Sequence, residues 1–307
     1  MTVLSIVIPL LDESSLVKEL VKRVQNNVEL ISNNYEVILI DDGSQDETWE
    51  KIQIESMSNP KIKGIKLSRN FGHHYAITAG LHSALGNWVV VMDGDLQDRP
   101  EVIPELFKKA KEGFDVVFVS RQNRPEGIFY RAAQKIFYEL LKLLSGMEFD
   151  STHANFSIIS RKVVDAFKSF PEHARFYGST ITWLGFKKVS INADHGIRYS
   201  GKPSYTFKKR IKLAFDIVIS FSEKPLRMAI VLGISMSIIS LVTALWIILK
   251  SLSVGFLVSG WASIMVAMFF MSGIFLIFMG IIGIYVGEIF RQVKNRPLYI
   301  VEKRTNE

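Results

Sequence analysis

The chain has 307 residues, a formal net charge of +7, 48% hydrophobic residues and no cysteine. The absence of cysteine excludes disulfides, a thiolate nucleophile and a zinc-thiolate site. No charged residue lies between Arg227 and Lys250 or between Lys250 and Glu288, and each gap is long enough to cross a bilayer. Because many Lys and Arg residues cluster beside these gaps, the basic excess indicates anionic lipid rather than nucleic acid as a partner.

Short apolar runs alternate with segments of helical periodicity along the first part of the chain. Runs of this kind, ended by proline, glycine or acids, predict buried strands, and their alternation with helices predicts a doubly wound, mostly parallel sheet. We expect strands at residues 4–9, 36–40, 62–67, 88–92 and 114–120, and helices at residues 15–30, 76–85 and from 99–101 onward.

Acidic residues follow two of these strands. Asp93 and Asp95 come after the run 88–92, and Asp41-Asp42-Gly43 comes after the second strand. Since ligands bind beyond the carboxyl ends of strands in open α/β sheets, and Mg²⁺ and Mn²⁺ share carboxylate ligands with substrate phosphates, we predict a cation site here. A bare Asp-x-Asp leaves a ligand-free acidic turn as the alternative. No glycine-rich phosphate loop follows any predicted strand, which argues against kinases and dehydrogenases.

The second half of the soluble part has a weaker pattern. The strand at 114–120 ends at Arg121, whose charge would complement the acids around a diphosphate. We expect a helix at 130–144, a loop at 169–178 and a helix followed by a strand within 180–191, whereas 150–160 is ambiguous. Arg198 and Lys202 belong to a polar loop at 195–205.

The last third of the sequence predicts a membrane anchor. Residues 207–221 form a basic amphipathic pattern expected of an interfacial helix, and spans are expected at 226–249 and 261–286. Lys and Arg flank the pair on both sides, so the positive-inside rule places both flanks in the cytoplasm. Without an ionisable group inside the spans, a hairpin anchor is favoured over a pore. No signal peptide is apparent, and we expect a cytoplasmic catalytic domain on a bacterial inner membrane.

Four motifs in this order resemble those of family-2 glycosyltransferases with the GT-A fold, and more narrowly the polyprenyl-phosphate glycosyltransferases. They are Ile8-Pro9-Leu10-Leu11-Asp12-Glu13, Asp41-Asp42-Gly43-Ser44, Ser68-Arg69-Asn70-Phe71-Gly72 and Asp93-Gly94-Asp95-Leu96-Gln97-Asp98. The resemblance covers nearly the whole chain. It implies a Rossmann-like GT-A domain at 1–205, an amphipathic juxtamembrane helix at 206–224, a two-span hairpin at 225–290 and a cytoplasmic tail at 291–307.

The resemblance also implies roles for individual residues. Asp93, Asp95 and Gln97 would hold Mg²⁺ or Mn²⁺; Pro9, Leu11, Glu13, Asp42, Gly94, Gln97 and Lys202 would line the nucleotide-sugar pocket; and Arg121, Arg131 and Arg198 would hold donor or acceptor phosphates. The implied reaction is an inverting, metal-dependent transfer of one sugar from a nucleotide-sugar, such as UDP-glucose or another UDP-hexose, to undecaprenyl or a related polyprenyl phosphate. The lipid-linked monosaccharide would serve modification of a cell-envelope glycan.

Two departures and two alternatives qualify this interpretation. Many relatives have a Gly-Asp-Phe-Arg-Leu-like segment where this chain has Asn155 and Ser157 in place of the acid and the arginine, and Asp12 stands where relatives commonly have asparagine. The alternatives are a lipid or glycan hydroxyl acceptor, which would need a base, and a non-catalytic scaffold that recruits a flippase or later transferase. A homo-oligomer stays open. Four scattered histidines are expected to have surface or hydrogen-bonding roles rather than to bind metal: His73, His74, His153 and His195.

Overall fold

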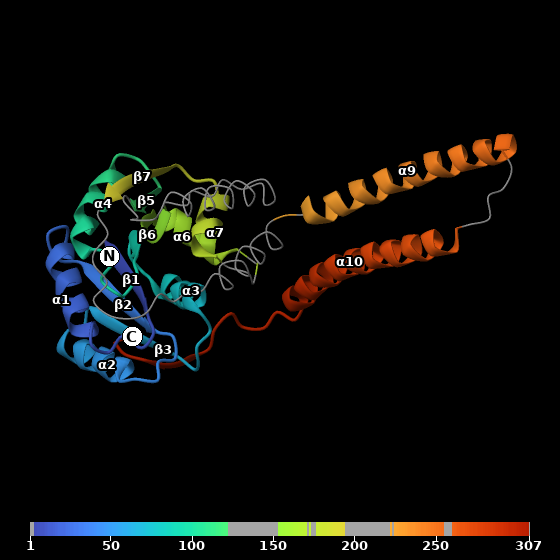
Figure 1. The fold of residues 1–307 in the computed structure, drawn as a ribbon. Coiled ribbons are helices and arrows are strands. Elements are labelled where there is room, and N and C mark those ends of the chain that lie inside the picture. The colour runs from blue at the N-terminus through green and yellow to red at the C-terminus, as the bar shows by residue number, and fades with distance from the viewer. Residues whose placement is uncertain are drawn as a thin grey trace. The chain divides into compact units, whose positions relative to one another are not determined.

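The computed structural model describes residues 3–121, 153–170, 172, 176–193, 222, 224–254 and 260–306. The helices expected at 130–144 and 207–221 lie outside these residues. The described residues belong to two compact units. One unit holds the chain up to residue 193 together with residues 296–306, and the other holds two long helices and Ser222 (Figure 1).

One eight-stranded sheet forms the centre of the first unit, with strand order β7-β5-β6-β4-β1-β2-β3-β8. Most neighbouring strands are parallel, whereas β6 and β8 run antiparallel to their neighbours. The mostly parallel α/β sheet predicted from the sequence is confirmed. The strands are β1 (Leu4–Leu10), β2 (Tyr35–Asp41), β3 (Ile62–Leu67), β4 (Trp88–Val91), β5 (Val116–Arg121), β6 (His153–Ser160), β7 (Lys188–Ala193) and β8 (Val301–Arg304).

Helices cover both faces of this sheet because successive side chains of each strand point to opposite faces. Ile6 and Ile8 belong to one apolar core and Val7 to the other. The first core is completed by α1 (Val17–Val28), α2 (Thr48–Ser58) and α4 (Ile103–Lys111), which follows the short 3₁₀ helix η1 (Pro100–Val102). The second is completed by α3 (His73–Ser83), α6 (Arg161–Lys168) and α7 (Tyr177–Trp183).

The structure differs from the sequence pattern in three places that matter for the site. The ambiguous segment at 150–160 contains β6, which starts at the sheet edge where β4 and β5 end. Helix α3 begins at His73, three residues before the expected start at 76. The expected tail contains β8, which pairs with β3, so residues that follow the last long helix complete the sheet.

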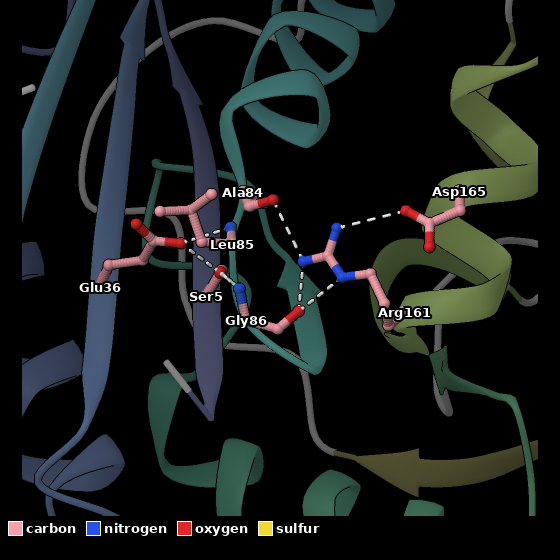
Figure 2. Close-up of polar contacts among 7 residues, drawn as sticks. All are labelled: Ser5, Glu36, Ala84, Leu85, Gly86, Arg161 and Asp165. Carbon is pink, nitrogen blue, oxygen red and sulfur yellow. Dashed lines mark hydrogen bonds and ion pairs between the residues drawn. The ribbon is translucent and has the colours of Figure 1, made fainter. Parts of the chain in front are cut away.

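A buried polar network fixes the opposite edge of the sheet, at the amino ends of the strands (Figure 2). Glu36 Oε1 accepts hydrogen bonds from Ser5 Oγ (2.6 Å) and the Leu85 N–H (2.7 Å), and the Lys63 ammonium lies 2.9 Å from Glu36 Oε2. The Arg161 guanidinium donates to the carbonyl oxygens of Ala84 and Gly86, just beyond the end of α3. The network ties the α3–β4 connection to β1, β2 and the start of α6.

The second unit contains α9 (Lys224–Val254) and α10 (Trp261–Val293). Residues 226–243 of α9 and 270–293 of α10 are long and apolar enough to cross a membrane, and none of these residues is buried inside the structure. Within this unit Tyr285 Oη donates a 2.7 Å hydrogen bond to the Ser222 carbonyl. Apolar side chains that remain exposed on two such helices are suited to a nonpolar surrounding rather than to water.

Candidate active site

The predicted site residues gather at the carboxyl edge of the sheet. Strands β1, β2 and β4 are parallel neighbours, so their following loops meet at this edge. Pro9 lies near the end of β1, and the loops carry most of the remaining predicted set: Leu11, Glu13, Asp42, Asp93, Gly94, Asp95 and Gln97. Arg121 is the last residue of β5, whose carboxyl end lies at the same edge, whereas Arg131, Arg198 and Lys202 lie outside the described residues.

The loop after β4 is a closed turn that presents two acids. The Oδ2 atom of Asp98, a residue only 3% exposed, accepts the Asp93 N–H at 3.1 Å, and Asp95 Oδ1 accepts the Gln97 N–H at 3.1 Å. Leu96 takes a left-handed backbone conformation with φ of 59°, which lets the chain reverse within the turn. Asp93 and Asp95 therefore belong to a turn. Their relative orientation is set by this turn and not by the alternation of an extended strand, in which residues two apart point to the same face.

Gly94 allows this loop to lie directly against the chain after β1. A Cβ atom at position 94 would come within 2.2 Å of Leu10 Cδ2 and 2.5 Å of Glu13 Oε2. Any larger residue at this position would require the side chains of Leu10 and Glu13 to move. The Glu13 carboxylate thus lies against the residue that separates the two aspartates, and its contact with a nucleotide-sugar stays a prediction.

His73 contacts Asp93 at the same edge. His73 Nε2 lies 3.2 Å from Asp93 Oδ1 and 3.1 Å from the Asn155 side-chain amide. A protonated Nε2 donates to the Asp93 carboxylate, whereas an unprotonated Nε2 accepts from Asn155 Nδ2. Burial lowers the pKa of His73, but the hydrogen bond to Asp93 and the charges of Asp93, Asp42 and Glu13 outweigh burial and leave the pKa raised.

Asp42 holds the loop that leads to His73. Its two carboxylate oxygens accept the Phe71 N–H at 2.8 Å and the Gly72 N–H at 2.9 Å, and the residue is 2% exposed. Burial raises the pKa of Asp42, although the two backbone donors act in the opposite direction. In this geometry the carboxylate positions the loop from residue 68 to residue 72, and its contact with a nucleotide stays a prediction.

The loops after β1 and β2 are also joined to each other. The Asp12 N–H donates to Ser44 Oγ at 3.0 Å, and Asp12 Oδ1 accepts the Gln45 N–H at 2.8 Å. Asp12 has a positive φ of 55°, a conformation that Asp and Asn adopt more readily than most residues. The backbone conformation thus accommodates the aspartate that replaces asparagine at this position.

The residue types at this edge fit a divalent cation that is shared with a substrate. The described part of the chain assembles no cluster of three or more His, Cys, Asp or Glu residues that could hold a metal ion by protein ligands alone. Asp93 and Asp95 nevertheless supply two carboxylates on one turn, which is the usual protein contribution to Mg²⁺ or Mn²⁺ bound together with phosphates. The donor set therefore fits the predicted ion.

The contact from His73 to Asp93 and Asn155 was not identified from the sequence. The interpretation of His73 as a hydrogen-bonding residue agrees with the structure, but its partners depend on α3 beginning early and on β6 starting at this edge. The spacing of the histidines in the sequence predicts neither the early start of α3 nor the position at which β6 starts. Asn155 was recognised only as a departure from the family motif.

The fold and these loops define a glycosyltransferase of the GT-A type. Residues 5–167 match the family model "Glycosyl transferase family 2", and the chain belongs to this family. It is 37% identical to the glycosyltransferase YkcC of Bacillus subtilis over 97% of this chain and 93% of that protein. It is 34% identical to the SfII prophage-derived bactoprenol glucosyl transferase of Shigella flexneri, over 98% of this chain and 97% of that protein.

A solved structure supports the same fold assignment. Glucosyl-3-phosphoglycerate synthase from Mycobacterium tuberculosis, in complex with Mn²⁺, UDP and phosphoglyceric acid, superposes with a TM-score of 0.52. The match covers 71% of this chain and 76% of that chain at 18% identity. The GT-A fold predicted from the four sequence motifs is confirmed.

Proposed function

We propose that this glycosyltransferase transfers one sugar from a nucleotide-sugar, a UDP-hexose such as UDP-glucose, to undecaprenyl or a related polyprenyl phosphate. The observation that carries the proposal is the extent of the similarity to proteins named bactoprenol glucosyl transferase. The match spans 98% of this chain, so it includes both long apolar helices as well as the acid-bearing loops. An enzyme with a lipid acceptor needs both parts.

The long helices would anchor the enzyme at the acceptor. In this proposal residues 225–290 form a two-span hairpin, and the Lys and Arg residues on both flanks face the cytoplasm. The soluble unit then lies on the cytoplasmic side, where nucleotide-sugars are made. Exposure of the apolar side chains on α9 and α10 supports contact with lipid.

Asp93 and Asp95, with Gln97, would hold Mg²⁺ or Mn²⁺ beside the donor diphosphate. When bound, such an ion acts as a Lewis acid that stabilises the charge on the leaving diphosphate. His73 orients Asp93 by donating to its carboxylate, and Gly94 leaves room for the Glu13 side chain against the loop. The Mn²⁺ and UDP in the solved neighbour are compatible with this donor set.

A phosphate acceptor reduces the need for a general base. A phosphomonoester has a second pKa of about 6 and is largely ionised at neutral pH. The enzyme must instead bring two anions together, and cationic side chains achieve this by positioning and charge neutralisation. We propose Arg121, Arg131, Arg198 and Lys202 for this role.

A direct assay tests the proposal. Purified protein in lipid nanodiscs is supplied with undecaprenyl phosphate, Mn²⁺ or Mg²⁺, and a panel of UDP- and GDP-sugars. We expect one donor to give an acid-labile lipid-linked monosaccharide, and we expect Asp95→Ala or chelation to abolish the product. An acid-stable product would indicate a hydroxyl acceptor, and undiminished cellular function of an Asp93→Ala/Asp95→Ala variant would indicate a scaffold.

A further inference from the structure

The residues that follow α10 form a strap along the edge of the catalytic sheet, defined here as residues 297–306. Strand β8 pairs with β3 through Lys66 opposite Lys303 and Leu67 opposite Val301. The Ser68 N–H donates to the Ile300 carbonyl at 2.9 Å, so the pairing continues one residue past the end of β3. The strap therefore covers an edge strand that would otherwise expose unpaired backbone groups.

Side chains hold the strap at both ends. Tyr299 Oη lies 2.9 Å from His82 Nδ1 in the last turn of α3, and the Tyr299 ring packs against the apolar core on that face of the sheet. At the other end Thr305 Oγ1 accepts the Gly64 N–H at 2.8 Å and donates to Ser56 Oγ at 2.8 Å. These contacts join residues more than 200 positions apart in the sequence.

The backbone pairing between the strap and β3 ends at Ser68, where the loop that leads to the active site begins. Ser68, held by Ile300, is followed by Phe71 and Gly72, whose N–H groups are held by Asp42. The middle of this loop packs closely against Gly43, which follows β2. A Cβ atom at position 43 would lie 2.4 Å from the Arg69 carbonyl carbon, so the backbone at Arg69 has little room to move. The next residue after Gly72 is His73, which contacts Asp93.

We propose that the strap is a positioning element for the active site. By fixing Ser68 and the last turn of α3, it holds both ends of the segment that contains Phe71, Gly72 and His73. Release of the strap would loosen this segment and with it the contact between His73 and Asp93. Because the strap follows α10 directly in the chain, residues attached to the second apolar helix take part in building the catalytic edge.

The test uses the full chain in nanodiscs. Tyr299→Phe combined with Thr305→Val removes the contact of the Tyr299 hydroxyl with His82 and the side-chain hydrogen bonds of Thr305, and keeps the size of each side chain. We expect faster amide exchange at Ser68, Phe71 and Gly72, and a decrease in kcat/KM for the donor of about tenfold, as expected when two hydrogen bonds are lost. Glu302→Gln, an exposed change within β8, is the matched control and should leave both quantities unchanged.

A disulfide provides the rescue. Lys66→Cys and Lys303→Cys introduce the only thiols of the chain at directly opposite positions, where Cα atoms of antiparallel strands are about 4.5–5.5 Å apart and within disulfide range. In the loosened variant, oxidation of this pair should restore kcat/KM to within about twofold of wild type, an expectation that follows from restored loop order. Reduction should reverse the gain, and each single cysteine should have no effect.

Several results would overturn the proposal. These are unchanged amide exchange in the loosened variant, faster exchange with undiminished kcat/KM, no recovery after crosslinking, or a crosslink that forms only between two copies of the chain. The inference rests on the proposed transfer reaction for its activity measurement. Failure of that reaction would appear as an inactive wild type, whereas amide exchange reports on the strap independently of activity.

Discussion

His73 Nε2 lies 3.2 Å from Asp93 Oδ1, so the first turn of α3 meets the loop after β4 through one side-chain contact. We expect His73→Leu to lower kcat/KM for the donor by roughly 10- to 100-fold, since a hydrogen bond to a charged group contributes roughly 1.5–3 kcal/mol. His73→Gln places an amide N–H near the position of Nε2 and should recover most of the loss. Steady-state kinetics over a range of Mn²⁺ concentrations will check this. Equal activity of the Leu and Gln variants would contradict a role for the donated hydrogen bond.

Asp42 should be important for the stability of the catalytic edge. Asp42→Asn leaves one acceptor oxygen for two backbone donors and places an NH₂ group against the second, so unfolding should become easier by about 1–3 kcal/mol. Urea unfolding of the protein in detergent measures the change. Glu47→Gln, an exposed change in the same loop, should alter the midpoint little. A stable Asp42→Asn variant with weaker donor binding would instead indicate a direct nucleotide contact.

His74 makes the protein sensitive to mild acid. Burial and the neighbouring His73 lower its pKa from the ordinary 6.5 to about 3, and its Nδ1 accepts the Tyr177 N–H at 3.4 Å. The unfolded chain therefore binds a proton below pH 6.5 that the folded chain does not. The contribution of His74 to the free energy of unfolding is complete above pH 6.5. Between pH 6.5 and about pH 3 this contribution falls by at most about 1.4 kcal/mol for each pH unit.

The variant His74→Asn isolates this effect. Asparagine keeps an acceptor for Tyr177 but does not titrate, so urea midpoints should depend less on pH between 6.5 and 4 than in wild type. The raised pKa of His73 acts in the opposite direction in both proteins and cancels in the difference. Parallel pH profiles of the two proteins would show that His74 is accessible to protons in the folded state.

Arg161 should affect stability without affecting catalysis. Its guanidinium caps the carbonyls of Ala84 and Gly86 at the edge opposite the site (Figure 2), and lysine cannot reproduce this forked set of donors. We expect Arg161→Lys to lower the free energy of unfolding by about 1–3 kcal/mol. The donor KM of the folded enzyme should not change. Lys51→Gln, which breaks an exposed ion pair with Glu47, is the control.

The convergence of Asp93 with Glu13 and Asp42 could be predicted because it follows from a general property of parallel sheets. Apolar runs of strand length identified β1, β2 and β4, and the residues after them meet at one edge. The GT-A fold could likewise be predicted from four motifs in order. The first inference depends on local sequence and strand direction, and the second depends on the resemblance of the motifs to those of known glycosyltransferases.

The remaining features depend on long-range contacts. Strand β8 contains one apolar residue, Val301, followed by Glu302, Lys303 and Arg304, and only pairing with β3 gives this segment its conformation. The contact of His73 with Asn155 requires the start of β6 at the catalytic edge, and the Arg161 network requires a carbonyl cluster formed by a turn. Neither arrangement has a periodic signature in the sequence.

The position of β8 also has a consequence for biosynthesis. The ribosome makes β3 early and β8 only after both apolar helices, so the nascent domain carries an open strand edge for roughly tens of seconds while those helices are synthesised. The eight-stranded sheet is complete only after translation has passed both apolar helices.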